Sequence, residues 1–176
     1  MSALPLGFRL AQLLGLTGAA WLSGNIAAFS FVAAPALLRS CNEGSASAST
    51  VVKQWRSIYE GGKAQNPPIA AATAFSFLYL AWASRSTKNV AGPMAWEIST
   101  LYGTASFLTL GIIPFTLIFM RGNLNALVSK ANMDAVSADK SGLEIQILIS
   151  KWIALNAIRS MLPLAGSVVG MIATFL

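Results

Sequence analysis

The last apolar segment of the chain begins with aromatic, amide and cationic residues at helical spacing. Trp152, Asn156 and Arg159 follow one another at intervals of four and three residues, so they share one face of a helix. An arginine inside a bilayer costs about 2.5–3.5 kcal/mol on insertion scales, and it normally faces a bundle interior or a cavity. Its long stem can also snorkel to the surface, but snorkelling does not explain why Asn156 lies on the same face. This face therefore predicts a buried polar site.

Two other segments, and one position in the first apolar stretch, carry similar side chains. They are Trp55, Tyr59 and Lys63 before the second apolar stretch, Asn123 and Asn125 after the third, and Asn25 within the first. Taken singly, they suit interfacial anchors, topology charges and turn residues. Taken together at one end of a helical bundle, they would line a pocket for a flat, apolar, phenolic molecule.

The composition points to a membrane and away from metal chemistry. Of 176 residues, 55% are hydrophobic and 10% are charged, against about 25% charged in a typical soluble domain. The chain has no histidine and a single cysteine, which argues against haem, two-histidine iron and catalytic zinc sites. We therefore expect any redox chemistry to proceed without an ordinary protein-bound metal. The net charge of +6 comes from cations spread singly over the predicted loops, which favours membrane topology over nucleic-acid binding.

Four apolar stretches are long enough for membrane helices, which need roughly 20 residues. They cover residues 10–38, 64–84, 98–120 and 154–176, and the second begins its spanning part near Pro67. Short connections favour an all-α, antiparallel four-helix membrane bundle that forms a single domain over residues 1–176. Small residues, among them Gly18, Gly166 and Gly170, are expected at its helix contacts.

A short helix is expected before the second span. Thr50 can cap it, and the apolar residues up to Tyr59 fall on one face, so we expect an amphipathic helix on the membrane surface. Gly61 and Gly62 should end it, and Pro67 should open the next helix. By the same logic, the third span should end at Gly122.

The loop charges predict the orientation. Residues 39–63 and 121–151 each carry four Lys or Arg residues, whereas the opposite side has only Arg9, Arg85 and Lys88. The positive-inside rule therefore places the first and third loops in the cytosol and both termini outside or in a lumen. We expect an integral protein of the endoplasmic reticulum or another endomembrane, with lumenal termini.

The order of these motifs resembles the fungal anthrone oxygenase family of small four-span membrane proteins. The resemblance covers nearly the whole chain and rests on four segments: SGNIAAFSFVAAPALL, QWRSIYEGGKAQNPPIAAATAFSFLYLAW, GIIPFTLIFMRGNLNAL and KWIALNAIRSMLPLAGSVVG. Their pattern is W-x3-Y-x3-K with a following proline, then N-x-N-x-L, then W-x3-N-x2-R.

The resemblance implies a monooxygenase that converts an anthrone to an anthraquinone with O2, in polyketide biosynthesis and without metal or flavin. On this hypothesis Arg159, supported by Lys63, stabilises the deprotonated substrate, and Tyr59 accepts or relays the proton. Asn156 and Asn125 would hydrogen-bond the substrate oxygens, with Asn123 and Asn25 as further contacts. Trp55 and Trp152 would stack on its rings.

A second function remains open from the sequence. The same side chains would allow a non-catalytic membrane carrier or scaffold to bind a hydrophobic aromatic metabolite. Transport predicts polar residues along the whole bundle, whereas here they gather at one end. The sequence therefore favours a surface-accessible site.

Overall fold

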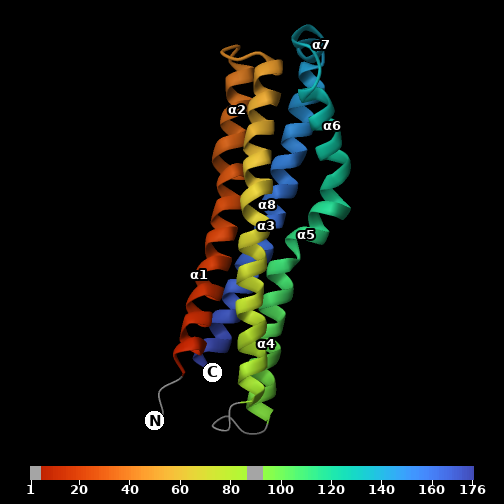
Figure 1. Cartoon of the computed structure of the whole chain (residues 1–176). Coiled ribbons are helices and arrows are strands. Elements are labelled where there is room, and N and C mark those ends of the chain that lie inside the picture. Colours follow the sequence, from red (N-terminus) through yellow and green to blue (C-terminus); the bar gives the residue numbers. More distant parts are fainter. Residues whose placement is uncertain (1–4, 87–92) are drawn as a thin grey trace. The chain divides into compact units, whose positions relative to one another are not determined.

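The computed structural model describes residues 5–86 and 93–176, and within these ranges all regular secondary structure is helical. The elements in order are α1 (Leu6–Ala28), η1 (Phe29–Ala33), α2 (Ala34–Asn42), α3 (Ala48–Ser86), α4 (Pro93–Leu110), α5 (Ile112–Phe115), η2 (Thr116–Met120), α6 (Arg121–Ala131), α7 (Ala135–Lys140) and α8 (Gly142–Phe175) (Figure 1). The two η elements are π-helical turns. The predicted all-α class is confirmed.

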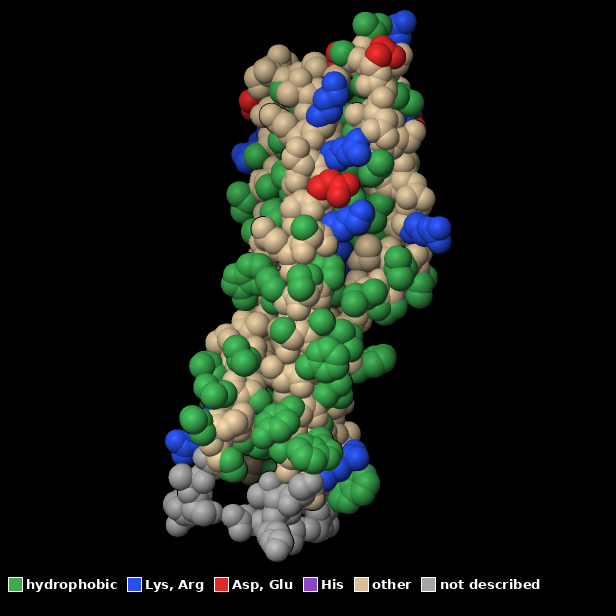
Figure 2. Space-filling model, viewed as in Figure 1, with side chains coloured by type: hydrophobic (Ala, Val, Ile, Leu, Met, Phe, Trp, Pro, Cys, Tyr) green, Lys and Arg blue, Asp and Glu red, His purple; other side chains and the backbone are tan. Residues whose placement is uncertain are grey.

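The chain forms two compact units. Unit 1 comprises Met1–Gly24, Asn66–Ile113 and Ser160–Leu176, and unit 2 comprises Asn25–Gln65 and Pro114–Arg159. Nine of the twelve Lys and Arg residues belong to unit 2. On the face in Figure 2, most of the visible Lys and Arg side chains belong to unit 2, and large apolar side chains cover the part that holds α4.

Unit 1 is held together by close helix contacts at glycines. A Cβ on Gly18 would collide with Thr73 Oγ1, and one on Gly170 would lie 2.6 Å from the Phe77 ring. A Cβ on Gly166 would lie 2.9 Å from a backbone carbonyl of α4. Real Cβ atoms do not approach so closely, so these helices pack as tightly as they do because the residues lack side chains. The prediction of contacts at Gly18, Gly166 and Gly170 is confirmed.

Unit 2 has its own apolar core, built from one face of each of its helical segments. Its fully buried side chains include Val51, Val52 and Trp55 of α3, Leu127 of α6, and Ile145 and Ile149 of α8. Trp55 is the largest fully buried side chain of the described residues. The aromatic residue that the sequence singled out for the site is thus also part of the packing of the unit.

The predicted break before the second span is wrong. α3 is one helix of 39 residues that passes through Gly61, Gly62, Pro67 and Pro68. It begins at Ala48 rather than behind a Thr50 cap. Proline removes a backbone donor and glycine lowers helix propensity, but buried apolar side chains hold the helix on both sides of these residues. Packing outweighs local propensity, so a separate surface helix ending at Gly61 is not observed.

The predicted end of the third span is also wrong. Gly122 lies in the first turn of α6, which follows η2 without a turn between them. Among the described residues, three helical stretches are long and apolar enough to cross a membrane: Leu6–Asn42, Trp96–Ala131 and Gly142–Phe175. α3 is not among them. The four-span antiparallel bundle, the single domain, and the orientation stay predictions.

Candidate functional site

Two π-helical turns in unit 2 are hydrogen-bonded to the polar face of α8. Asn156 Nδ2 donates to the carbonyl of Ile26 at 2.9 Å and to Ser30 Oγ, in η1, at 2.8 Å. Arg159 Nη1 donates to Thr116 Oγ1, in η2, at 2.9 Å. π turns are rare and frequently lie at functional sites. Two of the three residues that the sequence placed on one helical face, Asn156 and Arg159, are therefore hydrogen-bonded to the two irregular turns of the unit.

Three aromatic rings pack beside this face. Trp55 is fully buried and stacks on Tyr59, with ring centroids 5.4 Å apart and planes 3° from parallel. Trp152 meets Trp55 edge-on at 5.8 Å and is itself buried. The spacing of four residues in α3 and the position of Trp152 on α8 bring these rings together, as the sequence predicted.

Tyr59 and Lys63 form the outer edge of the site. Tyr59 is half-buried and interacts electrostatically with Arg159. The Lys63 side chain is 62% exposed, and its Nζ lies 6.0 Å from the Tyr59 ring centroid and 3.9 Å from Glu60 Oε2. The Lys63 ammonium group thus lies over the Tyr59 ring at the surface of unit 2, where it also forms an ion pair with the exposed carboxylate of Glu60.

The three predicted asparagines outside α8 have different surroundings. Asn123 is buried, and its Nδ2 donates to the carbonyl of Leu148 in α8 at 3.1 Å. Asn125 is exposed on α6, and Asn25 is half-buried near the end of α1. Residues two apart in a helix point in nearly opposite directions, so Asn123 and Asn125 do not share one face. The structure therefore brings Asn123, but not Asn125, to α8.

Four buried polar atoms of the site have no hydrogen-bond partner within the described part of the chain. They are Trp55 Nε1, Asn123 Oδ1, Asn156 Oδ1 and Arg159 Nε. Two of them are N–H donors and two are acceptors. Leaving such a group buried and unpaired costs about 1–3 kcal/mol. We call Trp55, Tyr59, Asn123, Trp152, Asn156 and Arg159 the unit 2 cluster. It can satisfy its unpaired atoms by binding a molecule that offers both acceptors and donors.

Two cavities lie outside the unit 2 cluster. One of about 520 Å³ lies between α3 and α4 of unit 1, and one of about 430 Å³ lies beside Trp96 and Leu176. No residue of the unit 2 cluster lines either of them. Among the described residues, no group of three or more His, Cys, Asp or Glu side chains could hold a metal ion.

Sequence reasoning did not single out Ser30 and Thr116. Serine and threonine in apolar helices usually bond a carbonyl of their own helix, so neither hydroxyl stood out. The available signal was their position in stretches that are otherwise apolar. What the sequence could not show is that the helix locally widens to a π turn at both residues.

The fold and the site define a small helical protein with apolar helices of membrane length and a buried aromatic, amide and guanidinium cluster. The family model described as anthrone oxygenase matches residues 55–169, and the chain belongs to this family, as its motifs indicated. The match begins at Trp55 and includes every predicted site residue except Asn25.

Curated relatives agree with the family match. The chain is 38% identical to anthrone oxygenase encC of Aspergillus fumigatus, over 93% of this chain and 92% of the relative. It is 31% identical to anthrone oxygenase AgnL2 of Paecilomyces divaricatus, over 91% and 92%. It is 32% identical to the noranthrone monooxygenase of Aspergillus flavus, over 69% and 55%. The chain is therefore an enzyme of the oxygenase class. No solved structure gives a significant match.

Proposed function

We propose that this protein is a membrane-bound, cofactor-independent monooxygenase that oxidises an anthrone-type polyketide to an anthraquinone with O2. The observation that carries the proposal is that the unit 2 cluster combines buried, unpaired donors and acceptors with the Trp55–Tyr59 ring stack. A hydroxylated anthrone offers a carbonyl acceptor, phenolic donors and flat apolar rings. Its chemistry therefore complements each part of the unit 2 cluster.

The reaction needs no electron carrier because the substrate supplies the electrons. The benzylic methylene loses a proton, and the carbanion transfers one electron to O2, which gives a substrate radical and superoxide. These combine into a C–O bond, and the resulting peroxide takes up a proton. Cleavage of the O–O bond with loss of the second benzylic hydrogen yields the new carbonyl and one water. One oxygen atom enters the product and the other leaves as water.

Arg159 is the candidate for stabilising the deprotonated substrate. Its guanidinium is half-buried and anchored by Thr116, and its Nε–H is buried without an acceptor among the described residues. A positioned cation in a site of low dielectric favours the anionic state much more than a cation in water does. Asn156 Oδ1 is then free to accept from a phenolic hydroxyl, because its Nδ2 is already held by η1.

Tyr59 is the candidate proton acceptor or relay. It lies at the half-exposed edge, where it interacts with Arg159 and lies beneath Lys63. The substrate would stack against Tyr59, and the Trp55 and Trp152 rings would exclude water. Asn123 contributes an acceptor, whereas Asn125 and Asn25 are assigned outer contacts only.

The membrane setting belongs to the same proposal. An anthrone partitions into lipid, and a site with one exposed edge can receive it from the bilayer surface. We propose four spans, with the cation-rich loops of unit 2 in the cytosol and the termini in the lumen of an endomembrane. The excess of Lys and Arg in unit 2 supports this orientation.

The test compares purified wild-type protein with Arg159→Ala, Tyr59→Phe and the matched control Arg121→Ala. Arg121 is an exposed arginine of the same unit. Quinone formation and O2 uptake from an anthrone are measured under air and without oxygen. We expect losses of about 10²-fold or more in the first two variants and none in the control. Wild-type rates in both, above the spontaneous reaction, would refute the assignment. A carrier or scaffold would give no O2 uptake above the spontaneous reaction.

A further inference from the structure

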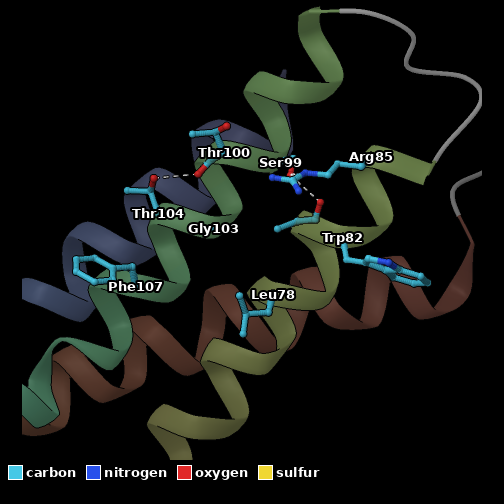
Figure 3. A pocket seen from close by; sticks show the side chains of 9 residues that line it. Leu78, Trp82, Arg85, Ser99, Thr100, Gly103, Thr104 and Phe107 are labelled. Atoms are coloured by element: carbon cyan, nitrogen blue, oxygen red, sulfur yellow. Dashed lines mark hydrogen bonds between the residues drawn. The ribbon is translucent and has the colours of Figure 1, made fainter.

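The groove of about 520 Å³ in unit 1 is a second site that the proposed chemistry does not use. It is lined by Leu78, Ala81, Trp82 and Arg85 of α3 and by Ser99, Thr100, Gly103, Thr104 and Phe107 of α4. Its volume falls within the range of about 300–1,000 Å³ that is typical of ligand sites. Figure 3 shows Arg85 reaching across from α3 to Ser99, with Leu78 and Phe107 farther along the helices.

The cationic end of the groove is fixed in place by hydrogen bonds. Arg85 Nε donates to Ser99 Oγ at 2.8 Å, and that hydroxyl donates to the carbonyl of Ala81 at 2.8 Å. The guanidinium also lies 4.8 Å from the Trp96 ring centroid. Within the described part of the chain, no carboxylate pairs with Arg85. The structure therefore holds a guanidinium at the mouth of the groove, where it can attract an anion.

The polarity of the groove changes along the helix axes. From Arg85 to Leu78 is about 10 Å along α3, at 1.5 Å per residue, and the far end is apolar. Between the ends, the hydroxyls of Thr100 and Thr104 donate to carbonyls of their own helix, at 2.7 and 2.9 Å. The middle of the groove thus offers few donors to a polyphenol. The groove therefore complements a molecule with one anionic end and one apolar tail.

The position of the groove indicates the source of such a molecule. α4 belongs to the candidate span Trp96–Ala131, and the apolar lining is open to the outside, with Trp82 65% and Phe107 77% exposed. Tryptophan and arginine side chains mark the interface between headgroups and acyl chains. We infer that this groove binds an anionic phospholipid, with the phosphate at Arg85 and an acyl chain along Leu78, Gly103 and Phe107.

Native mass spectrometry of the full chain in detergent micelles tests the inference. The protein is titrated with dioleoyl phosphatidylserine and, separately, with dioleoyl phosphatidylcholine. We expect one phosphatidylserine to be retained preferentially. Arg85→Gln should weaken this binding about fivefold, the effect of one cation near an anionic surface. The control Arg9→Gln removes another exposed cation of unit 1 that does not line the groove, and it should leave binding unchanged.

A second pair of variants tests the apolar part. Nothing lies within 4 Å of a Cβ built on Gly103 or on Gly24, and only Gly103 lines the groove. Gly103→Leu should therefore abolish retention of phosphatidylserine, whereas Gly24→Leu should preserve it. Helical circular dichroism and elution volume check that the variants fold. If Gly103→Leu does not fold, the inference is judged by the difference in phosphatidylserine retention between Arg85→Gln and Arg9→Gln.

Three results would overturn the inference. The first is an equal loss in Arg85→Gln and Arg9→Gln, which would indicate an effect of bulk charge. The second is displacement of the lipid by inorganic phosphate alone, which would indicate an anion site without a tail. The third is binding of an anthrone probe such as dithranol that Gly103→Leu weakens, which would make the groove an aromatic-ligand site. The first two results do not bear on the unit 2 cluster.

Discussion

Replacing Asn156 with alanine should destabilise unit 2 by about 1–3 kcal/mol. The side chain is fully buried, and it donates to the carbonyl of Ile26 at 2.9 Å and to Ser30 Oγ at 2.8 Å. A hydrogen bond contributes about 0.5–1.5 kcal/mol in folded proteins, and bonds between membrane helices average about 0.6 kcal/mol with a maximum near 1.7. Two such bonds give the stated range. The truncation also leaves a buried hydroxyl and a buried carbonyl without their donor.

The measurement is reversible unfolding of the purified chain in mixed micelles, followed by far-ultraviolet circular dichroism as the fraction of denaturing detergent rises. A double-mutant cycle with Ser30→Ala isolates one of the two bonds. We expect a coupling free energy of about 0.5–1.5 kcal/mol. The control is Asn125→Ala, an exposed asparagine of the same unit, which should change the free energy of unfolding by less than about 0.5 kcal/mol.

Additive effects of Asn156→Ala and Ser30→Ala would refute the reasoning. Additivity within about 0.3 kcal/mol is what independent sites show, and it would mean that this bond does not hold α8 to η1. A loss in Asn125→Ala as large as that in Asn156→Ala would be equally damaging, because burial would then not explain the effect.

Three further predictions use the same unfolding assay or a titration. Gly166→Ala should lower the free energy of unfolding by about 1–3 kcal/mol through overpacking, because the new Cβ would lie 2.9 Å from a backbone carbonyl of α4. The control Gly103→Ala meets nothing within 4 Å and should be neutral or stabilising by up to about 1 kcal/mol. Equal effects of the two substitutions would contradict the close contact at Gly166. Asp139→Ala should cost about 0.5–2 kcal/mol, because Asp139 Oδ1 accepts from the N–H of Ser49 in the first turn of α3 at 2.7 Å, and Asp139→Asn should recover most of the loss if that acceptor is the cause. The Asp134 carboxylate caps α7, and its hydrogen bonds with Ser137 lower its pKa below the ordinary value. The stabilisation by this cap is therefore present above the ordinary pKa and lost as the pH falls through the lowered one. The amide shifts of α7 measured by NMR should titrate in acid in wild type and not in Asp134→Asn.

Part of the site follows from sequence periodicity alone. Trp152, Asn156 and Arg159 were placed on one face by their spacing, and the structure shows Trp152 and Asn156 buried and Arg159 partly buried. Trp55 and Tyr59, four residues apart, stack as neighbours on a helix should. Regular spacing within one helix is local information, so it is readable before any tertiary contact is known.

The missed features depend on contacts between helices. The glycine and proline pairs of α3 carry strong local signals for a break, yet the helix continues because apolar residues on both sides of them are packed. The π turns differ from the α3 residues because no local sequence signal predicts them. Their hydroxyls at Ser30 and Thr116 accept hydrogen bonds from side chains of α8. Both outcomes are decided by partners distant in sequence.

The π turn η2 has a consequence for insertions and deletions. A π-helical turn accommodates one more residue than the same stretch of α-helix, and each residue corresponds to about 100° of rotation. Deleting a single residue between Thr116 and Met120 would straighten this stretch and swing the faces of α6 by that angle. Leu124 and Leu127, now buried, would then point away from the interior. The length of the chain here is thus as tightly constrained as the identity of its core residues.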